Sequence, residues 1–249
     1  MAPRREPGPG SRQRRSNNLL LVMFNSITVR FILPLTSVGV AEVCTYMGWG
    51  LLNNYSIDLS LDVAISLLIF DLVLYAQHVL LHKIPVLWRL HRLHHIDLDL
   101  DVTTGLRLHP FEVALSTFVR ILVILLLGAP ALAVMLFEVM LNATTMFNHG
   151  NVAVPTMVDR WLRWFIVTPD MHRVHHSLYR EERDSNYGFN LPWWDRLFGS
   201  YRAQPRDGCL QMRIGVSEFS GKITVNLMWL LFNPFINPEE TGEQMEKRL

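Results

Sequence analysis

Long apolar runs alternate with polar stretches along this chain of 249 residues. Four runs stand out, at residues 19–41, 59–81, 111–127 and 131–147. An α-helix rises about 1.5 Å per residue, so about 20 apolar residues cross a hydrocarbon core of about 30 Å. The pattern therefore predicts four membrane helices. Their order along the chain predicts two helical hairpins in an all-α fold.

Charged residues and prolines inside the runs modify this prediction. Arg30 and Pro34 interrupt the first run, which favours a kinked helix or one packed inside a bundle. Arg120 lies in the third run, so the second hairpin is either only partly inserted or turns Arg120 toward protein. The sequence Gly128-Ala129-Pro130 predicts a tight turn between the third and fourth runs.

The distribution of positive charge predicts the orientation in the membrane. Residues 1–18 carry five arginines, whereas residues 44–58 carry no lysine or arginine. By the positive-inside rule, both termini and the histidine-rich segments lie on the cytoplasmic side. We expect a disordered cytoplasmic tail at 1–18 and a membrane-embedded domain at 19–213. An extension at 214–249 contains an apolar stretch that we interpret as an interfacial helix.

Composition supports a membrane protein. Half of the residues are hydrophobic and 18% are charged, against about 25% in typical soluble domains. The net charge of +1 gives no electrostatic reason to expect a nucleic-acid partner. We therefore expect an integral membrane protein that contacts the lipid bilayer and a lipophilic ligand.

Candidate chemistry comes from the histidines, all ten of which fall between residues 78 and 176. On a helix, residues at offsets of three and four point in one direction, so neighbouring imidazoles reach one metal ion or two adjacent ions. Eight of them show these offsets: His78 and His82; His91, His94 and His95; His172, His175 and His176. A solvated histidine patch would not need the same spacing twice.

The number of histidines bears on the number of metal ions. Imidazole suits zinc, copper, iron and nickel, and a single zinc takes about four ligands. Eight clustered histidines therefore favour two ions, held by nitrogen alone, in a helical cap at the cytoplasmic helix ends. Asp71 and Tyr75 precede His78 by seven and three residues and share its face, so we expect both to lie beside the ligands and support them. Asp71 either orients a ligand histidine or makes a hydrogen bond that packs helices.

The motifs and their flanks resemble the fatty acid hydroxylase superfamily, also called sterol desaturases, over roughly residues 71 to 201. The resemblance is carried by His78-xxx-His82, Leu87-Trp88-Arg89-x-His91-xx-His94-His95, Arg107-Leu108-His109-Pro110-x-Glu112, Asn148-His149-Gly150-Asn151, Thr168-Pro169-Asp170-x-His172-Arg173-Val174-His175-His176, Asn186-Tyr187-Gly188 and Trp194-Asp195-Arg196-Leu197-Phe198-Gly199-Ser200-Tyr201. Ser200 departs from the threonine usual in the family.

This resemblance implies a membrane enzyme with two iron ions that uses O₂ to hydroxylate or desaturate a lipid. Zinc can replace the iron in a purified form. Electrons would come from a separate reductase or a small electron carrier. The implied ligands are the eight histidines above together with His149, while His109 matches a family histidine that we expect to support a ligand rather than bind metal.

Two other classes of protein fit some of these features. A zinc-dependent membrane hydrolase would need a carboxylate base beside the metal, as the HExxH motif supplies, and the sequence lacks that motif. A metal transporter or sensor without catalysis would place its site near the bilayer midplane, whereas these clusters lie at the helix ends. The sequence does not distinguish hydroxylation from desaturation, nor does it identify the lipid.

Overall fold

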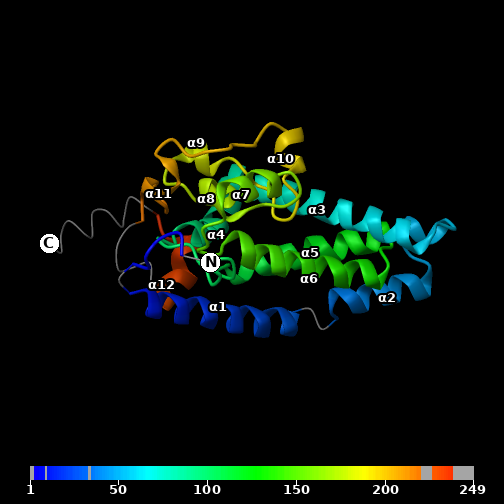
Figure 1. The fold of residues 1–249 in the computed structure, drawn as a ribbon. Coiled ribbons are helices and arrows are strands. Elements are labelled where there is room, and N and C mark those ends of the chain that lie inside the picture. Colours follow the sequence, from blue (N-terminus) through cyan, green and yellow to red (C-terminus); the bar gives the residue numbers. More distant parts are fainter. Residues whose placement is uncertain (1–2, 9, 33–34, 220–225, 238–249) are drawn as a thin grey trace.

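The computed structural model describes residues 3–8, 10–32, 35–219 and 226–237. Its regular elements are helices, and within these ranges extended pairing is limited to isolated bridges. The predicted all-α fold is confirmed. Figure 1 shows a bundle of long helices with a cap of short helices at one end.

Five helices, four of them with 18 residues or more, form the bundle. They are α1 (Ser11–Ile32), α2 (Ser37–Met47), α3 (Leu59–Lys83), α5 (Pro110–Leu127) and α6 (Ala131–Asn148). Four stretches of the described chain are long and apolar enough to cross a membrane: Ser11–Asn54, which holds α1 and α2, and the three helices α3, α5 and α6. This agrees with the four membrane segments predicted from hydropathy.

The first predicted segment consists of two helices. α1 ends at Ile32 and α2 begins at Ser37, and residues 33–34 between them lie outside the described ranges. The side chain of Thr36 caps α2 by accepting a hydrogen bond from the backbone N–H of Gly39 at 3.1 Å. Such a cap satisfies a donor that would otherwise be lost at the helix start.

The predicted disordered tail is wrong for residues 11–18, which form the first turns of α1. Arg14 is only 4% exposed and donates to the carboxylate of Asp97 at 2.8 Å. Asn18, one turn further on, is buried against the same loop and donates to Thr103 at 3.0 Å. A polar composition suggested disorder, but these side chains find buried partners in the cap, and their hydrogen bonds order the segment.

The bundle core lies between α2, α3, α5 and α6. Ala41 and Cys44 of α2 pack with Phe70 of α3, Ile124 of α5 and Phe137 of α6. In this bundle, α1 packs against α5, α2 packs against both α5 and α6, and α3 packs against α6. The α5–α6 connection is the predicted Gly-Ala-Pro turn.

A glycine is required where that turn begins. Gly128 has a φ of 71°, in the left-handed region that residues with a Cβ rarely adopt. A Cβ on Gly50 would lie 2.1 Å from the backbone nitrogen of Gly128. The two glycines therefore allow the α2–α3 connection to lie directly on the α5–α6 turn, at the end of the bundle far from the cap (Figure 1).

The cap is made of short helices and the loops between them. They are α4 (Pro85–His95), α7 (Thr156–Leu162), α8 (Pro169–His175), α9 (Arg180–Arg183), α10 (Trp193–Leu197), α11 (Gly208–Gln211), α12 (Leu227–Phe232) and the 3₁₀ helix η3 (Asn233–Phe235). α4 packs against α3 and η3, and α8 packs against α6. These contacts attach the cap to the membrane bundle.

The interfacial helix expected near the C-terminus begins among residues that lie outside the described ranges. α12 covers its described part, and Leu230 is fully buried with Leu21 and Leu93. Met228 and Phe232 are exposed on the other side of α12. One face of this helix therefore packs on the cap, and its contact with a membrane surface stays a prediction.

Candidate metal centre

All ten histidines are buried, and nine of them gather in two groups where the cap meets the bundle. α3 carries His78 and His82, α4 carries His91, His94 and His95, and α8 carries His172 and His175, while His149 and His176 occupy the C-cap positions of α6 and α8. The starts of α4 and α8 are set by Pro85 and Pro169, whose fixed φ suits a first helical turn.

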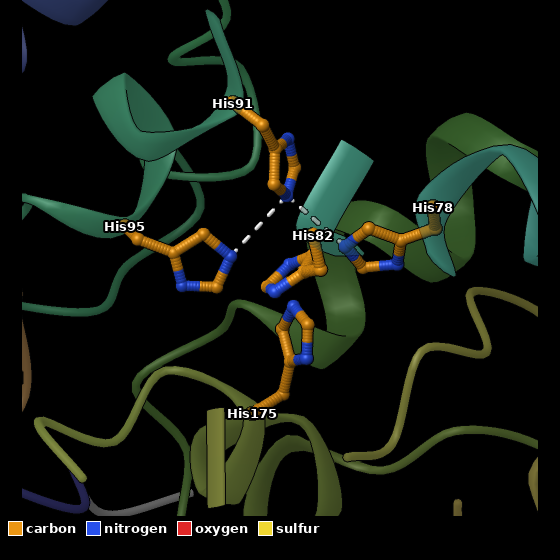
Figure 2. Close-up of side chains that lie close together, drawn as sticks. All are labelled: His78, His82, His91, His95 and His175. Carbon is orange, nitrogen blue, oxygen red and sulfur yellow. Dashed lines mark hydrogen bonds between the residues drawn. The ribbon is translucent and has the colours of Figure 1, made fainter. Parts of the chain in front are cut away.

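These side chains form two groups, each with ligand atoms within 4.8 Å of one another. The five-histidine group consists of His78, His82, His91, His95 and His175, and the four-histidine group consists of His94, His149, His172 and His176. Figure 2 shows the rings of the five-histidine group, drawn from α3, α4 and α8, pointing toward a shared centre. Each group could hold one metal ion.

Each HxxHH motif is divided between the two groups. His91 and His95, four residues apart on α4, belong to the five-histidine group, while His94 between them points into the other. In the second motif, His175 belongs to the five-histidine group, whereas His172 and His176 belong to the four-histidine group. The groups are adjacent, and the rings of His95 and His176 stack with centroids 4.5 Å apart. The two sites therefore form one centre.

Backbone carbonyl groups fix the orientation of three of the rings. Nδ1 of His78 donates to the carbonyl of Tyr187 at 2.7 Å, and Nδ1 of His175 donates to that of Ser185 at 2.7 Å. Nδ1 of His149 donates to Thr145 at 2.9 Å. A carbonyl oxygen only accepts, so Nδ1 carries the proton and Nε2 presents a lone pair, as a metal ligand requires.

A carboxylate fixes the fourth ring. Nδ1 of His91 donates to Oε1 of Glu112 at 2.7 Å, and both residues are buried. The Nε2 atoms of His78 and His91 then face each other at 3.0 Å with no proton between them. Two lone pairs at that distance repel unless a cation lies beside both. Two nitrogens that are about 2.1 Å from one ion and at right angles are about 3 Å apart, so the arrangement fits a metal.

The four-histidine group shows the same spacing. Nε2 of His149 lies 3.1 Å from Nε2 of His94 and 3.0 Å from Nε2 of His172. His172 in turn lies 3.2 Å from His176 through the same atoms. Because His149 has only one lone pair at Nε2, it cannot accept well from two neighbours, whereas all four nitrogens can ligate a common ion.

Burial keeps these imidazoles neutral. Desolvation lowers the pKa of His175 to about 3 and that of His149 to about 4. Burial, and then the neighbouring histidines, lower the pKa values of His94, His95 and His172 well below the usual range. The ligand nitrogens are therefore unprotonated at neutral pH, and metal binding need not displace a proton from them.

Asp71, Tyr75 and His109 were expected to support the ligands. Their side chains bond to residues other than the nine histidines of the two groups. Asp71 accepts from Asn190 at 2.7 Å and from Trp194 at 2.8 Å, which favours the helix-packing alternative. The hydroxyl of Tyr75 bonds to Ser200 at 2.9 Å. These two residues hold the loop that carries the Tyr187 carbonyl.

The third of these residues, His109, acts through the helix that follows it. Nδ1 of His109 accepts from the backbone N–H of Phe111 at 3.2 Å and so caps α5, while Nε2 donates to the carbonyl of Leu231 at 3.0 Å. This cap sets the first turn of α5, where Glu112 reaches His91. Its influence on the five-histidine group therefore passes through Glu112.

Two carboxylates, Glu112 and Asp184, contact candidate ligand histidines, and the sequence did not predict this contact for either of them. Glu112 stood in the quoted His-Pro-x-Glu motif, and its position three residues after a helix cap is the pattern that could have indicated its role. Asp184 lies 3.4 Å from Nδ1 of His82, in a charged stretch whose composition gives no such indication. Orientation of the rings, which was one of the two alternatives for Asp71, comes instead from contacts with Glu112, Asp184 and backbone carbonyls.

A cavity of about 520 Å³ leads to the centre between α1, α3, α5 and α6. His78, His91 and His94 line one end of it, so both histidine groups reach the cavity. Aliphatic side chains such as Leu74 and Val113 form much of its wall. Its volume lies within the range of about 300–1,000 Å³ typical of small-molecule sites.

The fold and the centre together define a helical membrane protein with paired histidine clusters at the cap end of its bundle. The sequence profile of the fatty acid hydroxylase family matches residues 63–200, more than half of the chain. The chain belongs to the fatty acid hydroxylase family. The matched region contains all nine histidines of the two groups.

Three relatives illustrate the range of this family. The chain is 33% identical over 181 residues to an ornithine lipid hydroxylase (OlsE) of Rhizobium tropici, covering 71% of this chain and 51% of that protein. It is 28% identical to an alkylglycerol monooxygenase of Xenopus tropicalis, covering 68% and 37%, respectively. It is 26% identical to a cholesterol 25-hydroxylase of Rattus norvegicus, covering 57% and 47%.

The chain thus spans about half or less of the length of these relatives. No solved structure gives a significant match.

Proposed function

We propose that this chain is an O₂-dependent lipid hydroxylase whose two histidine groups hold two iron ions. The observation that carries the proposal is the cavity of about 520 Å³, because it brings an apolar ligand to histidines of both groups. The names of the relatives support oxidation of a lipid, since each is a hydroxylase or a monooxygenase. Hydroxylation is favoured over desaturation by the same names.

When bound, the iron pair would supply the oxidising chemistry that places one oxygen atom of O₂ on a carbon of the lipid and releases the other as water, with two electrons from a separate reductase or small electron carrier. The nine histidines would hold the ions, and four of them (His78, His91, His149 and His175) are held in orientation by Glu112 and backbone carbonyls. Ligation would occupy their Nε2 lone pairs, so these histidines would not be available as general bases. The cavity wall positions the lipid and excludes water.

The topology is also a proposal. The arginine-rich N-terminal turns of α1 and the histidine cap lie at the same end of the bundle (Figure 1), which the positive-inside rule assigns to the cytoplasm. The two cysteines allow a direct test, because Cys44 is buried in the bundle and Cys209 is partly exposed in the cap. A membrane-impermeant thiol reagent should label Cys209 in inside-out vesicles and leave it unlabelled in sealed right-side-out vesicles.

The activity is tested on the full chain in lipid nanodiscs, loaded with Fe²⁺ and supplied with a chemical reductant and membrane lipid extract. Isotopically heavy O₂ should place one heavy oxygen atom in a hydroxylated lipid, which mass spectrometry detects. His94→Ala and His175→Ala each remove a ligand from one group, and both should abolish the product. Glu42→Gln is the control, since it changes a charged side chain of α2 outside both groups and outside the cavity lining.

The outcome also separates the other classes of protein. Turnover of an ester or amide lipid by the zinc-loaded chain without oxygen would indicate a hydrolase. Tight metal binding with no lipid product under any of these conditions would indicate a transporter or sensor. An alkene product that contains no heavy oxygen would indicate desaturation instead of hydroxylation.

A further inference from the structure

Two opposite charges line the cavity away from the histidines. Arg120 of α5 donates from Nη1 to Oε1 of Glu138 of α6 at 3.1 Å, and both side chains line the same cavity as His78 and His91. They are part-exposed, at 24% and 34%. Ionisable groups within apolar membrane helices are costly and mark functional sites where they face a cavity. The Arg120 side chain therefore contacts protein, which is one of the two alternatives predicted from the sequence.

The pair lies well away from the histidines along the helices. Arg120 follows Glu112 by eight residues on α5, which corresponds to about 12 Å of helix rise. Glu138 precedes His149 by eleven residues at the end of α6, or about 16 Å. A ligand that reaches both ends of the cavity therefore has a polar contact at one end and the histidine centre at the other.

The pair offers both donors and an acceptor to such a ligand. A guanidinium has five N–H donors and a carboxylate has two oxygens, whereas the bond between Arg120 and Glu138 uses one of each. Within the part of the chain that the structure describes, the side chains of this pair bond to each other. Arg30 also lines the cavity and has an interaction of its own.

The chemistry that fits this pair is a hydroxyl group. The two charges neutralise each other, and a hydroxyl can accept from Arg120 while it donates to Glu138. A free carboxylate would have to lie against the Glu138 carboxylate. It would also have to be desolvated inside the membrane-spanning helices, which costs far more than burying a hydrogen-bonded hydroxyl.

We propose that the cavity binds an uncharged, long-chain lipid alcohol, whose hydroxyl is held by Arg120 and Glu138 while a carbon distant from that hydroxyl lies beside His78, His91 and His94. This makes the pair a specificity determinant. The part that concerns the reacting carbon rests on the proposed oxygenase function. The binding of the hydroxyl does not.

The test measures equilibrium binding to the metal-free full chain in nanodiscs, with radiolabelled octadecanol, its methyl ether and octadecanoate as probes. The ether keeps the acceptor oxygen but cannot donate to Glu138. We expect the wild-type chain to bind octadecanol about tenfold more tightly than the ether, as befits one hydrogen bond to a charged group. The double variant Arg120→Leu, Glu138→Leu removes both charges together, a replacement that proteins often tolerate, and should bind the two probes equally.

Glu138→Gln is a second variant that keeps an acceptor oxygen and should retain part of the preference. Glu42→Leu is the matched control, because it removes a charge from α2 outside the cavity lining and should keep the full preference. A wild-type preference for octadecanoate, or a preference for the alcohol that persists in the double variant, would overturn the proposal. Because neither metal nor oxygen is present, a failed oxygenase assay leaves this result intact.

Discussion

Glu112 provides a direct test of how the five-histidine group is organised. Its Oε1 accepts from Nδ1 of His91, and its Oε2 is buried with no hydrogen-bond partner among the described residues. The carboxylate therefore acts on the centre chiefly through one ring. We expect Glu112→Ala to release that ring and weaken metal binding in the five-histidine group, while the four-histidine group keeps its affinity.

The size of the effect follows from burial. His91 is 1% exposed, so removal of its acceptor leaves a buried N–H unsatisfied at a cost of about 1–3 kcal/mol. That cost corresponds to an affinity about 5- to 150-fold weaker. Loss of a group that supports a metal ligand typically costs about 10–100-fold, in agreement with this range. If the freed proton moves to Nε2, the lone pair is lost as well and the effect lies at the upper end.

The assay is a metal titration against a competing chelator, followed by a count of ions per chain. The wild-type chain should bind two ions tightly, and Glu112→Ala should retain one at a chelator concentration that leaves the wild type full. Glu112→Gln keeps an acceptor oxygen and should lose only part of the affinity. Glu42→Gln removes a carboxylate outside the centre and should behave as wild type. Equal affinities in Glu112→Ala and the wild type would refute the orienting role of the carboxylate.

Three further predictions concern stability. Arg14→Leu leaves the buried Asp97 carboxylate without its closest cation and should lower the free energy of unfolding by about 3 kcal/mol in a denaturant titration, whereas Arg12→Leu at an exposed position should not. In the metal-free chain, His175 and His149 have folded pKa values of about 3 and about 4, below their unfolded values of about 6.5. The unfolded chain then binds more protons below about pH 6.5, so the melting temperature should rise as pH increases from about 4 to 6.5 and level off above, and a flat profile would contradict this. Chelation of the metal should lower the melting temperature at neutral pH, because the ions bind the folded state, and an unchanged value would show that the clusters hold no ion.

The helical architecture could be predicted from sequence because hydropathy and charge report directly on membrane helices. The apolar runs correspond to α3, α5 and α6 and to the segment holding α1 and α2. The prediction failed over residues 11–18, where composition suggested a solvated tail. Arg14 and Asn18 are polar, yet they bond to a buried loop about 80 residues further on. A long-range partner of this kind leaves no periodic pattern in the sequence.

The sequence predicted which histidines gather at the centre but not how they divide into the two groups. Offsets of three and four residues showed that the side chains converge, because helix geometry fixes their directions. The sequence left open whether a motif serves one ion or two. The answer depends on how α4 and α8 are rotated against α3, since His94 and His175 each point away from the other histidines of their own motif. That rotation is set by packing in the cap rather than by local spacing.

The groups that orient the histidines were the hardest to find, because most of them are backbone atoms. The carbonyls of Tyr187 and Ser185 accept from ligand rings, and any residue could supply a carbonyl there. Their positions come from a loop in which Asn186 adopts a φ of 50°, an unusual value for a residue other than glycine. The side chain of Asn186 donates to the carbonyls of Met171 and Arg202, which holds this conformation.

The division of each motif between two groups links the two sites physically. α4 and α8 each supply candidate ligands to both groups, so an ion bound in either group would hold the same helices in place. In the absence of metal, buried nitrogens such as Nε2 of His82 and of His175 lack hydrogen-bond partners among the described residues, a state that costs free energy for every such atom. Metal binding through these nitrogens would remove that cost in the five-histidine group and hold α4 against α8. One bound ion would therefore be enough to hold both helices, and a chain that has lost one ion should keep the site of the other in order.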